Sequence, residues 1–279
     1  MLQVNDLSKV YKGGFFSKDK LTAVESVSFQ IKKGDCFGII GESGSGKTTI
    51  GKIVAGLLKP TSGELYIDGK NILKNSEMKT SNFRRRVQMI FQEPDGVMDP
   101  RWKIERSMME PLDIHFSLNR NQKIEKVNYW LETVGLTPEH LERYPFELSG
   151  GQLQRLAFAR ALSMEPDLII ADEPTSSLDV SVQAQILTLM KKIQKRYELT
   201  ILFITHDLYV ARQMCSEIAV MQNGRFVETG SAEGVFDHPQ EKYTQMLIDS
   251  QLPLDFSVRK KLEYTGECYD GKFCRNYCK

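Results

Sequence analysis

The sequence predicts an α/β protein in which a parallel sheet is covered by helices on both faces. Three short apolar runs have the form of buried strands, at residues 37–40, 168–171 and 200–205. Helical spacing of apolar residues follows the first two runs, from Ile50 to Leu57 and from Val182 to Tyr197. Strands that alternate with helices in this way are typical of a parallel sheet.

The N-terminal part has a different character. Short apolar runs separated by turns at residues 2–4, 23–24 and 27–31 predict an antiparallel β subdomain. Further along, Leu65 and Ile67 alternate with polar residues before Asp68–Gly69, a dipeptide typical of a hairpin turn.

The middle of the chain is predicted to be helical. Between about residues 93 and 164, Met, Glu and Lys are abundant and β-branched residues are few, which indicates a helical subdomain inserted between strands of the core. We therefore predict one domain over residues 1–252, followed by a polar, cysteine-containing extension over residues 253–279.

Composition excludes several classes of protein. Apolar residues make up 41% and charged residues 26%, which is typical of a globular chain rather than a disordered one. Lys and Arg total 37 against 36 Asp and Glu, so the net charge of +1 disfavours a nucleic-acid binder. The run at residues 84–86 is interpreted as a solvated basic edge. The apolar runs are far shorter than a membrane span of about 20 residues, and the N-terminus lacks the pattern of a signal peptide, so we expect a soluble cytoplasmic protein.

Residues 41–48 read GESGSGKT and match the phosphate-binding pattern G-x-x-x-x-G-K-[ST] between a predicted strand and a predicted helix. Glycines allow successive backbone N–H groups to converge on phosphate oxygens, and the helix N-terminus adds a positive dipole end. Lys47 would bind the β and γ phosphates, and the Thr48 hydroxyl would bind Mg²⁺. The alternative is an ordinary Gly/Ser turn, which the strand and helix on either side disfavour. The predicted nucleotide-binding residues of this loop are Gly41, Ser43, Gly44, Ser45, Gly46, Lys47, Thr48 and Thr49.

Two acidic residues follow the predicted strand at 168–171. Asp172 and Glu173 would lie at the carboxyl end of the sheet, where α/β proteins bind their ligands. Asp172 would hold Mg²⁺ directly or through a water, and Glu173 would polarise the water that attacks the γ-phosphate. A surface Asp-Glu pair is the alternative. We therefore expect the chain to bind and hydrolyse a nucleoside triphosphate.

A further motif separates this chain from other phosphate-loop proteins. Residues 148–152 read LSGGQ, and the next ten residues have one apolar helical face. Ser149 and the two glycines therefore open a helix, which is an anion-binding arrangement. The simpler interpretation is a serine N-cap with a flexible turn.

With LSGGQ and the spacing of the other motifs, the sequence strongly resembles the nucleotide-binding subunits of ABC (ATP-binding cassette) transporters. The resemblance implies that Gln92 is the glutamine that meets Mg²⁺ and faces the membrane partner. It also implies that His206 contacts the γ-phosphate and that Tyr11 stacks on adenine. Ser177-Leu178-Asp179 would be the D-loop, with Asp179 among the nucleotide-binding residues. For Tyr11 and His206, the alternatives are a plain strand aromatic and a structural histidine.

The resemblance also implies how the chain uses ATP. In this family the phosphate loop and the LSGGQ motif lie on separate lobes, and two subunits associate head to tail. Each ATP is then sandwiched between the phosphate loop of one subunit and the signature motif of the other, here Ser149, Gly150, Gly151 and Gln152. The implied cofactors are ATP and Mg²⁺.

Two segments resemble the oligopeptide, dipeptide and nickel importer subfamily, at residues 92–101 and 238–247. The first departs from that pattern at Asp99, where Asn is usual, and at residues 95–98, where Tyr-Ala-Ser-Leu is usual. The resemblance implies an importer ATPase for oligopeptides or dipeptides at the cytoplasmic face of the membrane. Its implied partners are a second, different ATPase subunit, two integral membrane permeases and an extracytoplasmic solute-binding protein. The alternatives are an ATPase for nickel or metal-chelate import and a non-transport ABC ATPase.

The five cysteines fall into two groups. Cys36 and Cys215 stand in apolar contexts and are predicted to be small buried hydrophobic residues. Cys268, Cys274 and Cys278 have the spacing C-x5-C-x3-C, which could gather thiolates around one metal. Members of the peptide-importer subfamily often carry a cysteine-rich extension that binds an iron–sulfur cluster, and this tail resembles a shortened version. Such a site normally needs four ligands, and the alternative is a reduced tail without metal.

Overall fold

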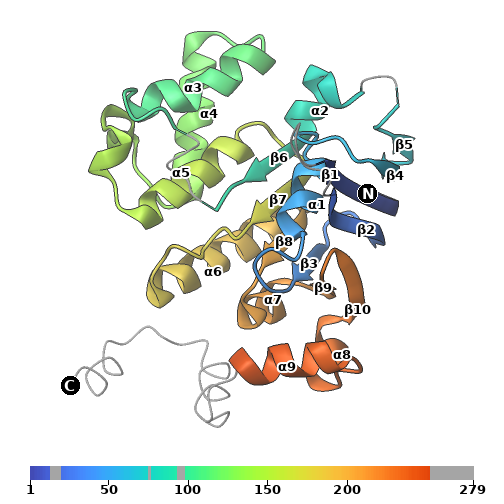
Figure 1. The fold of residues 1–279 in the computed structure, drawn as a ribbon. Coiled ribbons are helices and arrows are strands. Elements are labelled where there is room, and N and C mark those ends of the chain that lie inside the picture. Colours follow the sequence, from blue (N-terminus) through green and yellow to red (C-terminus); the bar gives the residue numbers. More distant parts are fainter. Residues whose placement is uncertain (13–19, 75–76, 93–97, 252–279) are drawn as a thin grey trace, which may run out of the picture.

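The fold contains two β-sheets (Figure 1). The computed structural model describes residues 1–12, 20–74, 77–92 and 98–251. The smaller sheet has the strand order β2-β1-β4-β5, and its paired strands are antiparallel. Its strands are β1 (Leu2–Lys12), β2 (Lys20–Ile31), β4 (Ser62–Ile67) and β5 (Lys70–Asn71). The predicted Asp68–Gly69 turn joins β4 to β5, and both of its residues have positive φ.

The larger sheet has the strand order β10-β9-β3-β8-β7-β6. Its strands are parallel from β9 to β6, and only the edge strand β10 is antiparallel. The strands are β3 (Cys36–Ile40), β6 (Val87–Ile90), β7 (Leu168–Asp172), β8 (Thr200–Thr205), β9 (Glu217–Gln222) and β10 (Arg225–Ser231). The three predicted buried strands, β3, β7 and β8, lie side by side in this sheet, so their carboxyl ends meet at one edge.

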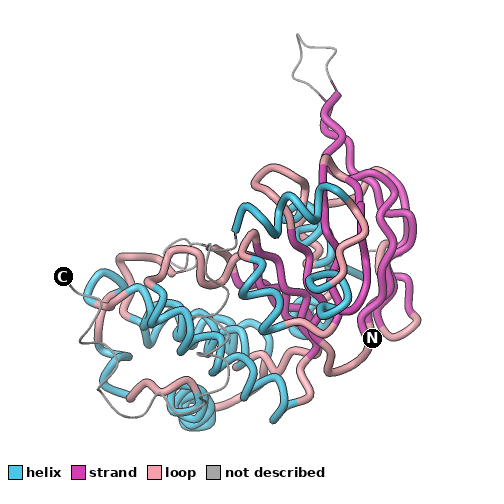
Figure 2. The backbone as a smooth tube through the Cα atoms, turned by 90° about the horizontal axis from the view of Figure 1, so that it is seen from below, coloured by secondary structure: helices cyan, strands magenta, loops and turns pink. Residues whose placement is uncertain are grey.

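Helices cover the large sheet and form a separate block to one side of it (Figures 1 and 2). Those next to the sheet are α1 (Lys47–Val54), α6 (Val180–Tyr197) and α7 (Leu208–Met214). The block contains α3 (Ile104–His115), α4 (Arg120–Thr133) and α5 (Gly150–Leu162), with the short 3₁₀ helices η3 (Pro138–Glu142) and η4 (Pro145–Glu147). The remaining described helices are η1 (Glu77–Lys79), α2 (Ser81–Arg86), α8 (Ala232–Asp237) and α9 (Lys242–Gln251).

The predicted fold class is confirmed: a parallel core, an antiparallel β subdomain and an inserted helical block are all present. Among the described residues of the block, the first helix begins at Ile104. Residues 93–97 of the predicted block lie outside the described residues. The predicted domain boundaries stay a prediction.

Both faces of the large sheet are buried. Along β7, Leu168 and Ile170 belong to one apolar cluster, whereas Ile169 and Ala171 belong to the other. Successive side chains of a strand point to opposite faces, so each cluster fills one side of the sheet. The first cluster lies between the two sheets and includes the apolar face of α1. The second lies under α6 and α7 and continues into the helical block.

Strand β9 and the edge strand β10 are not among the predicted elements. The run EIAVMQ is apolar at its centre, and Asn223–Gly224 follows it with both φ values positive. An Asn-Gly pair between two strands is a strong hairpin signal, so the sequence does contain the information for this pair of strands.

The prediction that Cys36 and Cys215 are buried is confirmed. They do not stand apart, because their Sγ atoms lie 3.7 Å from each other. Cys36 begins β3 and Cys215 follows α7, so the contact joins the strand that leads into the phosphate loop to a distant helix. Burial raises the pKa of the Cys215 thiol well above its usual value.

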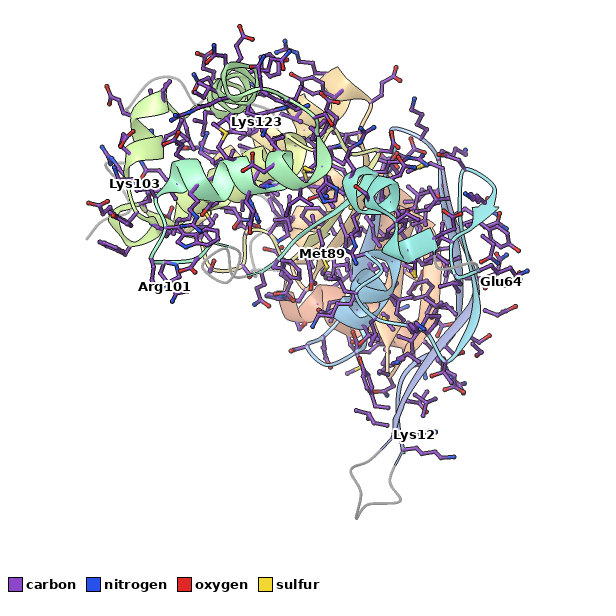
Figure 3. The ribbon with its side chains drawn as sticks, turned by 90° about the horizontal axis from the view of Figure 1, so that it is seen from above. Lys12, Glu64, Met89, Arg101, Lys103 and Lys123 are labelled. Carbon is purple, nitrogen blue, oxygen red and sulfur yellow. The ribbon has the colours of Figure 1, made fainter. Side chains whose placement is uncertain are left out.

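Charged side chains lie mainly on the outside of the molecule. Figure 3 shows Lys103 and Lys123 on the helical block and Glu64 on the antiparallel sheet, with Met89 of β6 between them. Among the described residues, no helix has the length and apolar character needed to span a membrane.

Candidate nucleotide site

The phosphate loop lies between β3 and α1, in tight contact with its surroundings. A Cβ atom at Gly46 would lie 2.1 Å from the carbonyl oxygen of Ala23, and one at Gly41 would lie 2.2 Å from that of Met221. Both glycines have positive φ. Only glycine fits at these two positions, because a side chain would overlap backbone atoms of β2 and β9.

Lys47 is held inside this loop. Its Nζ atom donates hydrogen bonds to the carbonyl oxygens of Gly41 at 2.7 Å and Glu42 at 2.8 Å. Burial lowers the pKa of Lys47, although the nearby carboxylates of Glu173 and Asp172 act in the opposite direction. The ammonium group is therefore oriented in advance by the backbone of its own loop.

Ser45 provides a test of whether the loop suits an anion. Its hydroxyl is buried and has no hydrogen-bond partner in the part of the chain that the structure describes. A buried hydroxyl without a partner is costly, and a phosphate oxygen in the loop would accept its hydrogen bond. Ser43, Gly44 and Thr48 are exposed at the mouth of the loop. These residues fit the phosphates of a nucleotide.

Oxygen donors for a cation lie next to the loop. The Thr48 hydroxyl donates a hydrogen bond to Oδ1 of Asp172, over a distance of 3.1 Å. Burial raises the pKa of Asp172, and the charge of neighbouring Glu173 raises it further. A hydroxyl and a carboxylate are ligands that Mg²⁺ prefers, and a bound cation would offset the cost of the buried charge. Thr48 and Asp172 therefore fit a Mg²⁺ site.

Glu173 and His206 come together from the ends of β7 and β8. The Nδ1 atom of His206 lies 3.0 Å from Oε2 of Glu173, and the Glu173 side chain is 14% exposed. Glu173 has a φ of 48°, in the left-handed region that side chains rarely adopt. Its backbone N–H donates to the carbonyl oxygen of Ile204 at 2.8 Å, which holds this conformation. Ile204 and His206 therefore hold the backbone and the carboxylate of Glu173, respectively.

Gln92 lies at the same edge, and Tyr11 lies in the antiparallel sheet. Ile90 of β6 pairs with Ala171 of β7, so Gln92 leaves its strand beside Asp172 and is exposed there. Tyr11 lies on β1 with 38% of its surface exposed, and the Nζ atom of Lys9 lies 5.3 Å from its ring centroid. The structure thus groups Gln92, Asp172 and the loop at one edge of the large sheet, whereas Tyr11 is paired with Leu21 in the antiparallel sheet. Their roles stay a prediction.

The signature motif lies in the helical block rather than in the parallel core. Ser149 is the N-cap of α5, whose side chain accepts a hydrogen bond from the backbone N–H of Gln152. A Cβ atom at Gly151 would lie 2.6 Å from Cγ1 of Val182, and one at Gly150 would lie 3.4 Å from Leu178. The two glycines therefore let the N-terminus of α5 approach the N-terminus of α6 closely.

Asp179 has a local structural role. Its carboxylate accepts hydrogen bonds from the backbone N–H groups of Ser181 at 3.1 Å and Val182 at 3.0 Å, and so caps α6. The bond from Val182 is the main reason why the pKa of Asp179 is lowered. Its predicted contact with nucleotide is not tested by this arrangement.

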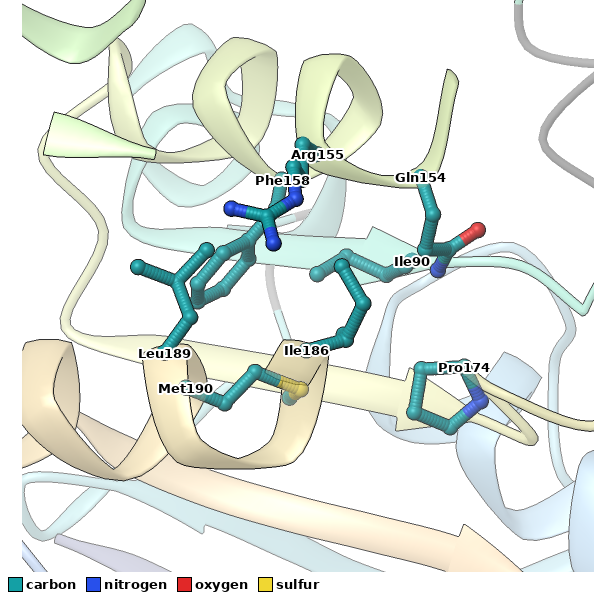
Figure 4. A pocket seen from close by; sticks show the side chains of 8 residues that line it. All are labelled: Ile90, Gln154, Arg155, Phe158, Pro174, Ile186, Leu189 and Met190. Carbon is teal, nitrogen blue, oxygen red and sulfur yellow. The ribbon is translucent and has the colours of Figure 1, made fainter. Parts of the chain in front are cut away.

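The signature helix is coupled to the core through side-chain packing. Side chains from β6, α5 and α6 surround a cavity of about 10 Å³, enough for one water molecule (Figure 4). Phe158 and Gln154 of α5 face Ile186 and Met190 of α6 there. Side chains of α5 and α6 therefore line one hollow, which lies between the signature helix and the helix that Asp179 caps.

Residues 24–176 match the sequence profile of the ABC transporter family. The chain is 41% identical over 271 residues to the dipeptide transport ATP-binding protein DppF of Escherichia coli (strain K12). That alignment covers 96% of this chain and 81% of the relative. This chain belongs to the ABC transporter family.

Other relatives and solved structures agree. This ABC protein is 43% identical over 263 residues to the oligopeptide transport ATP-binding protein OppF of Lactococcus lactis, covering 93% of this chain and 82% of the relative. A dimeric structure of the cassette MJ0796 bound to ADP and Pi matches with a TM-score of 0.74 and 30% identity, covering 83% and 99% of the two chains. CbiO1 of Clostridium perfringens matches with a TM-score of 0.74 and 27% identity, covering 94% and 98%. As predicted, the ABC protein is an ATP-hydrolysing transporter subunit that uses ATP and Mg²⁺.

One predicted site is not tested. Cys268, Cys274 and Cys278 lie outside the described residues, and within the described ones no group of three or more His, Cys, Asp or Glu side chains could hold a metal ion. A metal or iron–sulfur site in the extension stays a prediction.

Two contacts are not among the predictions made from the sequence. The Glu42 N–H donates to the Tyr243 hydroxyl of α9 at 3.5 Å, and His140 meets the signature Gln152. Tyr243 lies 201 positions from Glu42, and no local pattern indicates that pairing. His140 stands only 12 positions before Gln152, but the pairing depends on the turn between them.

Proposed function

We propose that this ABC protein is the ATPase subunit of an importer for dipeptides or oligopeptides. The names of the relatives, DppF and OppF, support peptides as the cargo class. The observation that carries the ATPase mechanism is the meeting of Lys47, Asp172, Glu173 and His206 at one edge of the sheet.

Each of these residues has one role in the proposed site. Lys47 binds the phosphates from a position fixed by two carbonyl oxygens. Thr48 and Asp172 hold Mg²⁺, which when bound screens the phosphate charge and orients the γ-phosphate. Glu173 orients the attacking water and accepts its proton. His206 holds the Glu173 carboxylate through Nδ1 and contacts the γ-phosphate. Gln92 contacts the metal, and Tyr11 stacks on the adenine.

The signature motif serves a second nucleotide. Ser149 and the glycines after it open α5 in the helical block, whereas Lys47 opens α1 between the two sheets. A helix N-terminus stabilises negative charge, so the start of α5 completes the site of an opposing subunit. The dimeric structure of the similar cassette MJ0796 supports this arrangement. Hydrolysis removes the γ-phosphate that joins the two surfaces and so reopens the dimer.

The proposed assembly contains further proteins. The second ATPase is a different subunit, and the pair acts on two integral membrane permeases supplied by an extracytoplasmic solute-binding protein. The chain binds peripherally to the cytoplasmic face of the membrane, and the segment after Gln92 contacts the permeases.

A substitution at Ser149 tests the sandwich. Ser149→Arg places a bulky cation at the start of α5, so ATP-dependent assembly should be lost while ATP binding to the chain's own loop persists. Assembly is measured by analytical ultracentrifugation of a Glu173→Gln chain, alone and with the second ATPase subunit that copurifies with it. Assembly that survives Ser149→Arg would refute the sandwich.

The cargo is tested in cells. Deleting the chain should abolish uptake of radiolabelled dipeptides or oligopeptides and leave uptake of nickel unchanged. Loss of nickel uptake alone would refute the peptide assignment.

A further inference from the structure

The side chain of Gln152 is engaged at both ends of its amide. Its Oε1 atom accepts a hydrogen bond from the backbone N–H of Ser149 at 3.0 Å, and the Gln152 backbone N–H donates to the Ser149 hydroxyl at 3.3 Å. Its Nε2 atom lies 3.3 Å from Nε2 of His140, in the 3₁₀ helix η3. His140 belongs neither to the phosphate loop nor to the signature motif.

The first of these bonds determines the direction of the second. Because the Ser149 N–H is a donor, the Gln152 atom that faces it must be the carbonyl oxygen, and the NH₂ group must face His140. The NH₂ group can only donate, so Nε2 of His140 must accept. His140 is then the neutral tautomer that carries its proton on Nδ1, which lies 3.0 Å from the carbonyl oxygen of Thr137 and donates to it.

The opposite tautomer is less favourable. With the proton on Nε2, Nδ1 of His140 would accept from the Thr137 N–H at 3.2 Å and from the Thr137 hydroxyl at 3.0 Å, but Nε2 would set an N–H against the NH₂ group of Gln152. That unmatched pair would be partly buried, whereas Thr137 is exposed and water can accept its N–H. Rotating the Gln152 amide instead would set its NH₂ group against the Ser149 N–H and break the cap of α5.

We infer that His140 is a positioning residue for the signature motif. It fixes the amide of Gln152, which holds Ser149 at the start of α5. The Ser149 hydroxyl accepts from the Gln152 N–H, so its own proton is free to point away from the helix. This inference rests on the proposed function, in which that hydroxyl meets the nucleotide of the opposing subunit.

Two substitutions of similar size separate the two nitrogens of His140. The amide of Asn reaches about as far as Nδ1, so His140→Asn keeps the contact with Thr137 and loses Gln152. The amide of Gln reaches about as far as Nε2, so His140→Gln returns an acceptor to Gln152. A role limited to the stability of η3 would make His140→Asn the milder change, and a role through Gln152 predicts the reverse order.

Hydrogen exchange of the full-length chain is the first measurement. His140→Asn should speed exchange of the backbone N–H groups of residues 149–152 by about 3- to 10-fold, the equivalent of one hydrogen bond, and His140→Gln should restore it. ATP affinity and thermal midpoint should stay within error of wild type in both variants. Unchanged exchange in His140→Asn, or equal exchange in the two variants, would overturn the inference.

ATP-dependent assembly in the Glu173→Gln background is the second measurement. His140→Asn should raise the ATP concentration at half-assembly by about 3- to 10-fold, and His140→Gln should return it toward the reference. If Ser149→Arg leaves assembly intact, the proposed ATP sandwich is refuted. The hydrogen-exchange data still test the positioning role of His140 in that case. If Ser149→Arg blocks assembly and His140→Asn matches the reference, His140 has no positioning role.

Discussion

The Nδ1 atom of His206 lies 3.0 Å from Oε2 of Glu173, at the ends of two adjacent parallel strands. Glu173 adopts positive φ at this point, held by a hydrogen bond from its N–H to the carbonyl oxygen of Ile204. Ile204 belongs to the strand that delivers His206, so one strand fixes both the backbone and the carboxylate of the proposed base.

Glu173→Gln should lower ATP turnover by about 100-fold or more, because an amide cannot accept the proton of the attacking water. ATP affinity should be retained, since Lys47 and the loop backbone are unchanged. Turnover is measured as phosphate release under saturating MgATP, with Glu198→Gln at the exposed end of α6 as the control. Near wild-type turnover in Glu173→Gln would exclude this residue as the base.

Lys47→Ala should weaken ATP binding by at least about tenfold, the typical contribution of a charged hydrogen bond to phosphate. The structure adds a reason for a large effect, since Nζ is already held by the carbonyl oxygens of Gly41 and Glu42. Equilibrium binding of a fluorescent ATP analogue checks it, and exposed Lys33→Ala serves as the control. Equal affinities in the two variants would contradict the assignment of the loop.

Asp172→Asn should raise the thermal midpoint of the nucleotide-free chain at pH 7 and weaken Mg²⁺-dependent ATP binding. Burial holds the pKa of Asp172 above its unfolded value, so ionisation of this carboxyl costs stability above the unfolded pKa. The cost disappears as the pH falls and the group protonates, so the difference between variant and wild type should shrink toward acid pH. Thermal melts over a pH series check the predicted stability, and melts with and without MgATP check the predicted loss of Mg²⁺-dependent binding. A variant that is less stable at pH 7 would show that the carboxylate is favourably paired.

Gly151→Ala should destabilise the fold even though alanine is the better helix former. The new Cβ would lie 2.6 Å from Cγ1 of Val182, a stiff β-branched side chain. Overpacking costs about 1–3 kcal/mol, which exceeds the gain of up to about 1 kcal/mol from helix propensity.

The matched test of that contact is a double-mutant cycle. Val182→Ala removes the obstructing methyl groups, so adding Gly151→Ala in that background should be neutral or stabilising. Thermal unfolding of wild type, the two single variants and the double variant gives the coupling free energy between residues 151 and 182. Additive effects would mean that the two helices do not press on each other at this point.

Local patterns accounted for the elements that build the site. The phosphate loop is contiguous, and the runs that form β3, β7 and β8 are apolar on both faces, so composition alone indicated buried parallel strands. The rule that such strands present their carboxyl ends at one edge placed Asp172 and Glu173 beside the loop, and the resemblance to the family added His206. The same reasoning could have found β9 from the Asn223–Gly224 turn.

The remaining features depend on tertiary contacts. Nothing local indicates that Tyr243 meets Glu42 across 201 positions, or that Cys36 meets Cys215 across 179. The capping role of Asp179 is local and follows from its place before α6, yet the resemblance to a family drew attention to its nucleotide role alone. Tertiary packing, rather than periodicity, decides the pairing of residues so far apart in the sequence.

The contact between Cys36 and Cys215 allows opening of the core to be followed by chemical labelling of a thiol. Burial keeps the Cys215 thiol protonated, so a thiol reagent can modify it only after the base of the phosphate-loop strand separates from the end of α7. The labelling rate of this sulfur therefore measures how often the core opens beneath the nucleotide. A ligand that stabilises the phosphate loop should lower the labelling rate of Cys215, and a ligand that leaves the core unchanged should not.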